Sequence, residues 1–235
     1  MANSRLVSSF RPDRRRFLAT LGGTVLACAV GVHAIPATGS MDPSRLRESM
    51  RAQYGSSGLD VIEEWLALLD RLSNSDLDTQ LREVNDFFNR RVKWVDDIDI
   101  WGQKDYWATP LETLGEGRGD CEDYSIAKYI TLVQLGVPVA KLRMIYVKAR
   151  PGRSDETIAH MVLGYYETPS AEPRILDNLQ PSIVPASQRT DLDPVFSFNS
   201  EGLWTGSSTT SKADPVARLS RWRRVLARME EQGFL

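Results

Sequence analysis

Cysteine and histidine are scarce in this chain, and their positions exclude several kinds of protein. The 235 residues include 2 cysteines and 2 histidines. Cys28 and His33 lie in an N-terminal segment that we expect to be removed, which leaves Cys121 and His160. A single cysteine cannot form an internal disulfide, so a disulfide framework is excluded. The sequence also contains no histidine-based metal motif and no phosphate-binding loop.

The chain also lacks an excess of positive charge. Its 29 basic and 31 acidic side chains give a formal net charge of -2. The first 34 residues hold five arginines and one aspartate, so the remainder has 24 basic against 30 acidic side chains, a formal charge of -6. A mildly acidic body argues against nucleic acid as a partner, because binding to nucleic acid depends on a basic surface.

A hydrophobic run long enough for a permanent membrane anchor is lacking as well. The apolar run from Ala19 to Val32 is shorter than the roughly 20 residues that a spanning helix needs. It follows Asp13-Arg14-Arg15-Arg16-Phe17-Leu18, and together the two segments resemble a twin-arginine export signal. Val32-His33-Ala34 matches a signal cleavage site, so we expect residues 1–34 to be cleaved on export. Val25-Leu26-Ala27-Cys28 also permits a weak lipoprotein cleavage site.

Helical periodicity dominates the first part of the mature chain. Candidate helices cover Arg45–Tyr54 and Leu59–Leu69, and a third begins at Ser75 or Asp76. The buried face of the third is marked by Leu77, Leu81, Val84, Phe87 and Phe88. We therefore expect a helical N-terminal lobe over residues 41–92, with one sizeable core in the chain as a whole.

Aromatic residues and aspartates are concentrated between Val92 and Pro110. The aromatic residues are Trp94, Trp101, Tyr106 and Trp107, and the aspartates are Asp96, Asp97, Asp99 and Asp105. Aromatic side chains in such a stretch can line a substrate groove. They can equally pack a loop against the core, and the sequence leaves both interpretations open.

The segment Gly115–Tyr124 carries the strongest local signal. Its three glycines, at positions 115, 117 and 119, predict a loop in unusual backbone conformations. Asp120 then has the character of a helix N-cap, with Cys121 as the first residue of a helix that ends near Gly136. A thiol at this position faces free N–H groups and the positive end of the helix dipole, which favours a nucleophilic thiolate. The alternative is that Cys121 is a small buried apolar residue.

After this helix the pattern changes to the alternation of β-strands. We predict strands over Leu142–Lys148, Thr157–Glu167 and Arg174–Leu179, joined as an antiparallel sheet. Helices followed by strands indicate an α+β fold. The Ser-, Thr-, Asp- and Pro-rich tail Gln188–Ser211 precedes a final helix over Arg218–Gln232, whose buried side is marked by Trp222, Leu226 and Met229.

His160 and Asp177 lie on two of the predicted strands. An aspartate in an apolar strand needs a partner for its charge. If the two strands are neighbours, Asp177 can orient His160, and His160 can reach the thiol of Cys121. The alternative is that His160 is a satisfied core histidine.

These residues give the chain a resemblance to a known family. With Asp105-Tyr106-Trp107-Ala108-Thr109-Pro110 leading into Gly-Arg-Gly-Asp-Cys-Glu-Asp-Tyr, and with the order Cys, His, Asp, the sequence resembles the bacterial transglutaminase-like cysteine proteinases of the LapG type. The resemblance extends from about Arg45 to the C-terminus. It implies a papain-like or transglutaminase-like fold, with a helical N-terminal part packed on an antiparallel sheet and a catalytic core over residues 93–235.

The resemblance also implies an activity, a metal and partners. The family's nucleophile, base and orienting carboxylate fall on Cys121, His160 and Asp177, and its calcium site falls on Asp120 and Glu122. It implies a periplasmic endopeptidase that cleaves the N-terminal region of a large surface adhesin and so promotes biofilm dispersal. It further implies inhibition by an inner-membrane cyclic-di-GMP receptor of the LapD type. An acyltransferase or deamidase with the same triad, or a non-catalytic adaptor of this fold, remains the alternative.

Charge alone also favours a bound cation beside Cys121. Asp120, Glu122 and Asp123 place three carboxylates around a residue that must become an anion, and these carboxylates would raise the pKa of the thiol. A cation held by oxygen ligands would cancel this repulsion, and such ligands favour calcium over zinc. The alternative is that Asp120 and Asp123 only cap the helix. For catalysis we expect the Cys121 N–H to bind the oxyanion, with a second donor near Trp107.

Overall fold

The computed structural model describes residues 41–152, 156–206, 208 and 210–234. The described residues belong to one compact unit. The predicted export signal, residues 1–34, and the lipoprotein alternative at Cys28 lie outside the described residues. Within the described part of the chain, no helix has both the length and the apolar character to cross a membrane.

Two helices open the described chain. Helix α1 spans Pro43–Leu72 and is kinked at Gly55, whose backbone has φ 67° and ψ -150°. The predicted helices Arg45–Tyr54 and Leu59–Leu69 are the two halves of α1, because only glycine adopts this conformation without strain. Helix α2 spans Leu77–Arg91 and is capped by Asp76, whose side chain accepts a hydrogen bond from the N–H of Thr79 at 2.9 Å.

A set of short elements leads to the central helix. They are β1 (Lys93–Trp94), α3 (Asp97–Trp101), α4 (Pro110–Glu116) and β2 (Arg118–Gly119), and β1 and β2 pair in parallel. Helix α5 (Cys121–Gln134) follows Asp120 as predicted, and it is buried along most of its length. It ends before Gly136, which has φ 85°.

The predicted glycine loop is only partly correct. Gly115 lies inside α4, Gly119 lies in β2, and of the three only Gly117 has a positive φ, at 62°. Gly115 is instead needed for packing, since a Cβ there would lie 2.3 Å from the ring of Tyr54. The glycines do permit close approach of the main chain, but they do not form one irregular loop.

Six strands form an antiparallel sheet in the order β6-β5-β4-β3-β7-β8. Their bounds are β3 Leu142–Ala149, β4 Ile158–Tyr165, β5 Arg174–Leu176, β6 Val184–Pro185, β7 Leu192–Phe198 and β8 Leu203–Thr205; the 3₁₀ turns are η1 (Val139–Lys141) and η2 (Ala186–Gln188). Two predictions need correction. Strand β5 ends at Leu176, so Asp177 directly follows the strand, and the tail Gln188–Ser211 contributes two strands that we did not predict.

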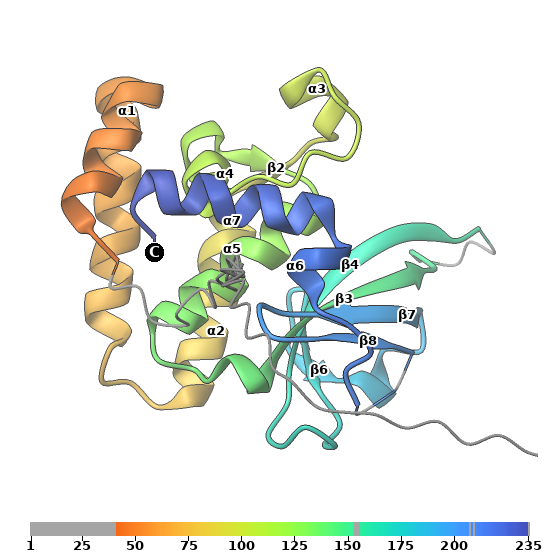
Figure 1. Ribbon diagram of the computed structural model, residues 1–235. Coiled ribbons are helices and arrows are strands. Elements are labelled where there is room, and N and C mark those ends of the chain that lie inside the picture. The colour runs from red at the N-terminus through yellow and green to blue at the C-terminus, as the bar shows by residue number, and fades with distance from the viewer. Residues whose placement is uncertain (1–40, 153–155, 207, 209, 235) are drawn as a thin grey trace, which may run out of the picture. The chain divides into compact units, whose positions relative to one another are not determined.

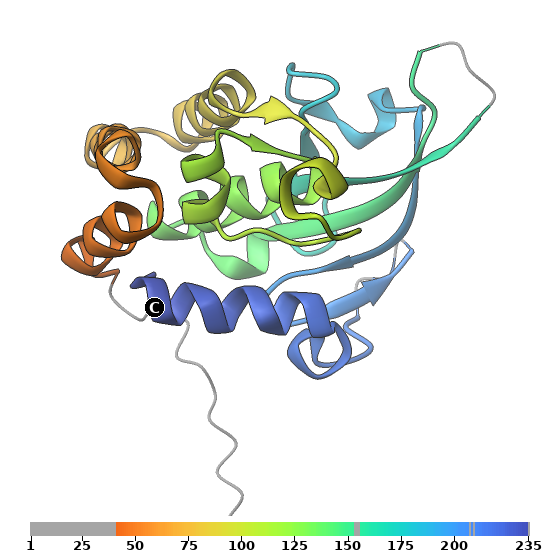
Figure 2. The same cartoon turned by 90° about the horizontal axis from the view of Figure 1, so that it is seen from above.

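The helices cover one face of this sheet. Helix α5 packs against β3 and β4, and α1 lies on the side of the helices away from the sheet in both views (Figure 1 and Figure 2). Side chains alternate along β3, so that Met144 joins the main core beneath α5 while Ile145 joins a smaller cluster on the other face. The chain ends in α6 (Pro215–Arg218) and α7 (Ser220–Gln232), with Trp222, Leu226 and Met229 buried as predicted.

Candidate active site

Cys121 lies in the first turn of α5 and lines a cavity. Its Sγ donates a hydrogen bond to Glu122 Oε2 at 2.9 Å. The cavity has a volume of about 490 Å³, and His160 and Trp94 are among the residues that line it. The hydroxyl of Ser125 lies 2.9 Å from the carbonyl oxygen of Cys121 and 3.1 Å from that of Met161. This hydroxyl holds the strand that carries His160 against the first turn of the helix.

His160 is held from behind by Asp177. Its Nε2 lies 2.8 Å from Asp177 Oδ1, and both side chains are buried. Because an ionised carboxylate only accepts hydrogen bonds, Nε2 carries the proton of the neutral ring. This leaves Nδ1 free to accept a proton from a neighbouring group. The structure therefore places Cys121 and His160 in one cavity, with Asp177 behind the histidine.

Arg189 completes this arrangement, and sequence reasoning missed it. Its Nη2 lies 2.8 Å from Asp177 Oδ2, while its Nε donates to Asp191 Oδ1 at 2.9 Å. Burial raises the pKa of Asp177, but the hydrogen bond and charge of His160, the N–H of Leu179 and Arg189 together lower it to about 2. Asp177 is thus a carboxylate at physiological pH. No local pattern distinguishes Arg189 in the sequence, because its role depends on a contact with another segment.

A cluster of carboxylates lies beside Cys121, with Asp97 and Asp123 buried and Asp120 half-buried. Asp97, Asp120 and Asp123 each offer an oxygen within 4.8 Å of the others, and Asp120 also lies in a group with Cys121 and Glu122. Among the described residues, Asp97 Oδ1 and Asp120 Oδ1 have no hydrogen-bond partner. Burial and then the neighbouring carboxylates raise the pKa of Asp120 to about 10 and that of Asp97 to about 7.

This cluster has the character of a cation site. Buried carboxylates that face one another retain protons unless a positive charge lies among them. Oxygen ligands of this kind suit a hard cation such as calcium. Sequence reasoning placed Asp120 and Glu122 here but missed Asp97, which we had assigned only to an acidic, aromatic stretch. Its position next to Asp120 results from the pairing of β1 with β2.

The electrostatic environment of Cys121 corrects one prediction. Burial raises the pKa of the thiol, and the charge and hydrogen bond of Glu122 and the charge of Asp120 raise it further. A hydrogen bond with the backbone of Met161 acts in the opposite direction. The helix N-terminus alone therefore does not produce a thiolate. Burial has the largest effect, and the carboxylates add to it in the direction that the charge argument from the sequence predicted.

The aromatic residues before α4 have two different roles. Trp94 lines the cavity with Cys121 and is 51% exposed, so it belongs to the predicted groove. Trp101 and Tyr106 instead pack against each other, with ring centroids 4.5 Å apart. Trp107 lines an adjacent cavity, and its indole N–H donates to Asp105 Oδ1 at 3.0 Å. This N–H is therefore not free to bind an oxyanion.

Comparison with known proteins identifies the family. The family model described as "Bacterial transglutaminase-like cysteine proteinase BTLCP" matches residues 69–193, a segment that contains Cys121, His160 and Asp177. The chain belongs to this family. A search of curated proteins finds no match. Membership in the bacterial transglutaminase-like cysteine proteinases makes the protein a cysteine protease by class, and the α+β fold with its antiparallel sheet agrees with the prediction.

Solved structures of LapG from Legionella pneumophila are similar to this protein over most of both chains. The EGTA-treated form is 38% identical with a TM-score of 0.70, covering 80% of this chain and 98% of the other. The calcium-bound form is 38% identical with a TM-score of 0.67, covering 80% of this chain and 99% of the other. A third LapG structure is 36% identical with a TM-score of 0.69, covering 80% and 98% respectively.

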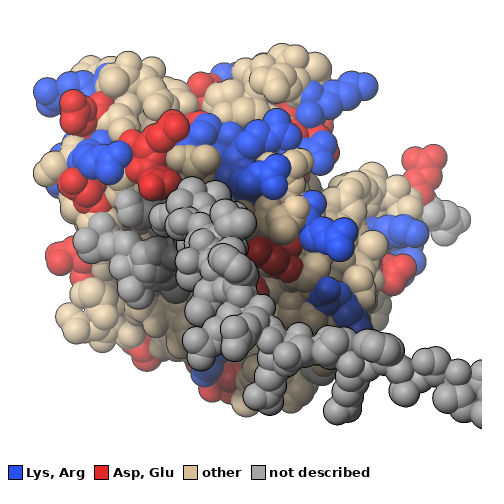
Figure 3. Space-filling view, viewed as in Figure 1, with Lys and Arg blue, Asp and Glu red and all other residues tan. Residues whose placement is uncertain are grey.

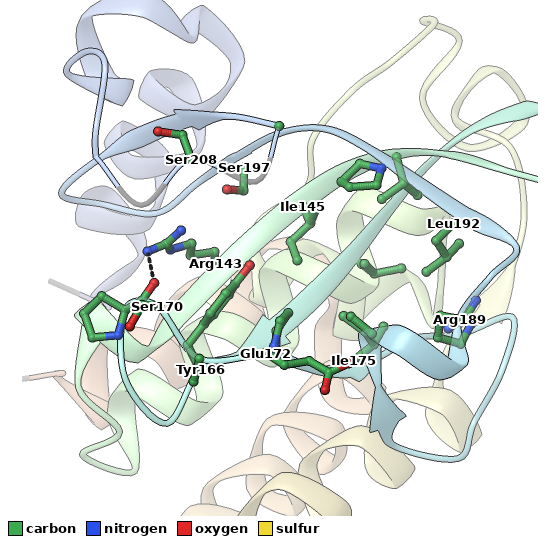
Figure 4. Close-up of a pocket in the computed structure, with 18 residues that line it drawn as sticks. Arg143, Ile145, Tyr166, Ser170, Glu172, Ile175, Arg189, Leu192, Ser197 and Ser208 are labelled. Carbon is green, nitrogen blue, oxygen red and sulfur yellow. Dashed lines mark hydrogen bonds between the residues drawn. The ribbon is translucent and has the colours of Figure 1, made fainter.

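A further cavity of this family member, about 500 Å³ in volume, lies against the other face of the sheet. Figure 4 shows Arg143 and Arg189 toward its two ends, with Ile145 and Ile175 between them. The residues that line it include no cysteine or histidine. Arg189, which lines this cavity, also forms the ion pair with Asp177.

Proposed function

We propose that this protein is a calcium-dependent periplasmic cysteine endopeptidase with Cys121, His160 and Asp177 as its catalytic triad. The observation that carries the proposal is the shared cavity of Cys121 and His160, with Asp177 Oδ1 only 2.8 Å from His160 Nε2. This is the arrangement of nucleophile, base and orienting carboxylate that acyl chemistry requires. The membership in a cysteine proteinase family supports the same reaction class.

The proposed mechanism follows from the shared cavity of Cys121 and His160 and from the hydrogen bond between His160 and Asp177. His160 Nδ1 accepts the proton of the Cys121 thiol, and the thiolate attacks the carbonyl carbon of the substrate peptide bond. The Cys121 N–H, at the start of α5, donates a hydrogen bond to the developing oxyanion. His160 then protonates the leaving amine, and water attacks the acyl-enzyme with His160 again as base. Asp177 keeps the proton of the neutral imidazole on Nε2 throughout.

Calcium fits the carboxylate cluster of this chain. Asp120 and Glu122 would hold the ion, and Asp97 and Asp123 are placed to contribute further oxygens. A bound calcium ion supplies positive charge that offsets the carboxylates around the thiol. Asp123 already accepts hydrogen bonds from the N–H groups of Ala108 at 2.8 Å and Asp120 at 3.3 Å, so it also ties the preceding segment to α5. The existence of a calcium-bound LapG structure supports extending this metal to the present chain.

The proposal includes a substrate, a compartment and a regulator. We expect the substrate to be a large outer-membrane-associated adhesin, cleaved near its N-terminus so that biofilm disperses. Export through the twin-arginine signal in residues 1–34 would place the enzyme in the periplasm. The periplasmic domain of a LapD-type cyclic-di-GMP receptor would restrain it there. These expectations come from the family resemblance, which the similarity to LapG supports.

Cleavage of the adhesin's N-terminal region by purified protein tests this function. Wild-type protein with calcium should give two fragments. Cys121→Ser should lower the rate by at least about a thousandfold, because removing one member of a triad removes most of its effect. Adding a primary amine should leave the hydrolysis products unchanged, whereas amine incorporation would indicate an acyltransferase. Full activity in folded Cys121→Ser would contradict the proposal.

A further inference from the structure

The cavity lined by Trp107, named the second cavity below, adjoins the cleft that contains Cys121. Its volume is about 380 Å³, and it is lined by Trp107, Phe196, Leu219 and Ser220 together with Arg218 and Arg221. It shares Asp105 and Tyr146 with the cleft around Cys121. An extended peptide that leaves the active site in this direction passes Asp105 and Tyr146 and enters the second cavity.

The sheet sets the direction and the length of this path. Tyr146 on β3 pairs in register with Met161 on β4, next to His160, and with Phe196 on β7. The rings of Tyr146 and Phe196 stack with centroids 5.2 Å apart and planes at 10°. Neighbouring strands are about 4.8 Å apart, so the path from β4 to β7 is about 10 Å and corresponds to about three residues of extended peptide.

The sign of the charge changes along this path. The walls around Cys121 include Asp96, Asp97, Asp120 and Glu122, with Lys104 as the basic residue of that lining. The second cavity instead contains Arg218 and Arg221. Arg221 forms an ion pair with Asp105 at 2.6 Å, which neutralises the one carboxylate that lines this cavity.

Arg218 is the charge that remains available. Its side chain is exposed and has no ion-pair partner within the part of the chain that the structure describes. It belongs to a basic region, since Lys and Arg side chains gather over α7 and the adjoining α6 on the face shown in Figure 3. A guanidinium that forms no ion pair with the described residues, in the lining of a cavity that also contains Tyr146 and Phe196, is suited to bind a carboxylate.

We propose that the second cavity is a substrate subsite that binds an aspartate or glutamate side chain about three to four residues from the scissile bond. The inference rests on the proposed protease function and adds a determinant of specificity to it. The stacked rings of Tyr146 and Phe196 support the apolar part of the peptide, and Arg218 binds the carboxylate. Substrates with a basic residue at this position are disfavoured.

A charge-reversal experiment tests the subsite. Quenched fluorescent peptides spanning the adhesin cleavage site are prepared with Asp, Asn or Lys at the third or fourth residue on either side of the scissile bond. Wild-type protein should cleave the Asp peptide of one series about two- to fivefold faster than the Lys peptide in kcat/KM, as expected for an exposed ion pair. In Arg218→Glu this ratio should invert. Arg224→Glu is the matched control, because Arg224 is an exposed arginine of α7 outside both cavities, and its ratio should equal that of wild type.

The outcomes separate the subsite from the protease function. If wild-type protein cleaves neither the peptides nor the adhesin fragment, both the protease function and the subsite are overturned. If the adhesin or the peptides are cleaved but the ratio of kcat/KM for the Asp and Lys peptides is the same in wild type and Arg218→Glu, the subsite is overturned. The protease function then still stands.

Discussion

His160 presents different nitrogens to its two neighbours, and this decides its chemistry. Nε2 donates a hydrogen bond to Asp177, so Nδ1 is the ring nitrogen that can accept a proton. Asp177 can fix this tautomer only while it is ionised, and its pKa of about 2 ensures this. Arg189 contributes to the low pKa through its ion pair with Oδ2. The residue that orients the base is therefore itself held by a second buried charge.

We predict that Arg189→Met lowers kcat by about tenfold or more, equivalent to about 1.4 kcal/mol in the barrier, while KM changes less. Loss of the ion pair raises the pKa of Asp177, so the acidic limb of the pH profile should shift to higher pH. The stability that Asp177 contributes is present above its unfolded pKa of about 3.9 and is lost as pH falls toward about 2. In the variant this loss should begin at higher pH.

The control for Arg189 is Arg143→Met. Arg143 is also a buried arginine of the cavity on the far face of the sheet, but it stacks on Tyr166 and Trp204 and does not contact Asp177. Both variants should lose stability in thermal unfolding. Arg189→Lys should recover part of the activity, because lysine restores the charge without the planar geometry. An unshifted pH profile in Arg189→Met would show that Arg189 is only structural.

For individual residues, the sequence predicted the positions that depend on residue type and local spacing. Cys121 lies at a helix start and His160 on a strand as predicted, whereas Asp177 was predicted within the next strand and directly follows it. Cys121 and His160 line one cavity, Asp177 contacts His160, and their catalytic roles stay a prediction. Arg189 and Asp97 were missed, because each acquires its role from a segment distant in the sequence. Asp97 faces Asp120 and Asp123 only after β1 and β2 have paired.

Among the elements, β2 and the start of α5 pack closely against each other. A Cβ at Gly119 would lie 2.7 Å from Asp123 Oδ2 and 2.9 Å from Asp123 Cβ. Asp123 belongs to the carboxylate cluster, so a methyl group at position 119 displaces one of its members. The glycine is needed here for close packing, while its conformation is one that other residues adopt.

We predict that Gly119→Ala raises the calcium concentration for half-maximal activity by about tenfold, a typical effect of disturbing groups that support a metal site. Gly117→Asn is the control, since a Cβ at position 117 meets no atom within 4 Å and asparagine tolerates a positive φ. Isothermal titration with calcium measures the affinity directly. Equal affinities in the two variants would contradict the placement of Asp123 at the ion.

The sequence predicted the long helices α1, α2, α5 and α7, but it missed the short helices α3, α4 and α6 and predicted the sheet incompletely. Apolar periodicity and Asp76, Asp120 and Gly136 marked the helices closely. Strand β7 was missed because it contains Pro194, which cannot donate a hydrogen bond to a neighbouring strand. The structure accommodates the proline where the register between β3 and β7 shifts, between Tyr146 and Val147. Such a bulge depends on the partner strand and has no signal in the segment itself.

In the whole molecule, the cleft is formed between the helices and the sheet. Helix α7 contacts the segment that forms one wall of the cleft. Arg228 of α7 donates to the carbonyl oxygen of Trp107 and lies 3.0 Å from Glu112 Oε1, while Arg221 pairs with Asp105. Asp105 has a φ of 60°, an uncommon value for a residue other than glycine, and its ion pair with Arg221 holds it there. The C-terminal helix thus stabilises the segment that connects the carboxylate cluster with the substrate groove.

We propose that a cation held by this carboxylate cluster enables Cys121 to act. The most direct measurement is the rate of adhesin-fragment cleavage by purified mature protein in EGTA, followed by stepwise addition of calcium. We predict background cleavage in EGTA, full recovery with calcium, and a higher calcium requirement for Asp120→Asn, with the fold of each sample verified by circular dichroism. Full cleavage by metal-stripped protein in excess EGTA would contradict the claim.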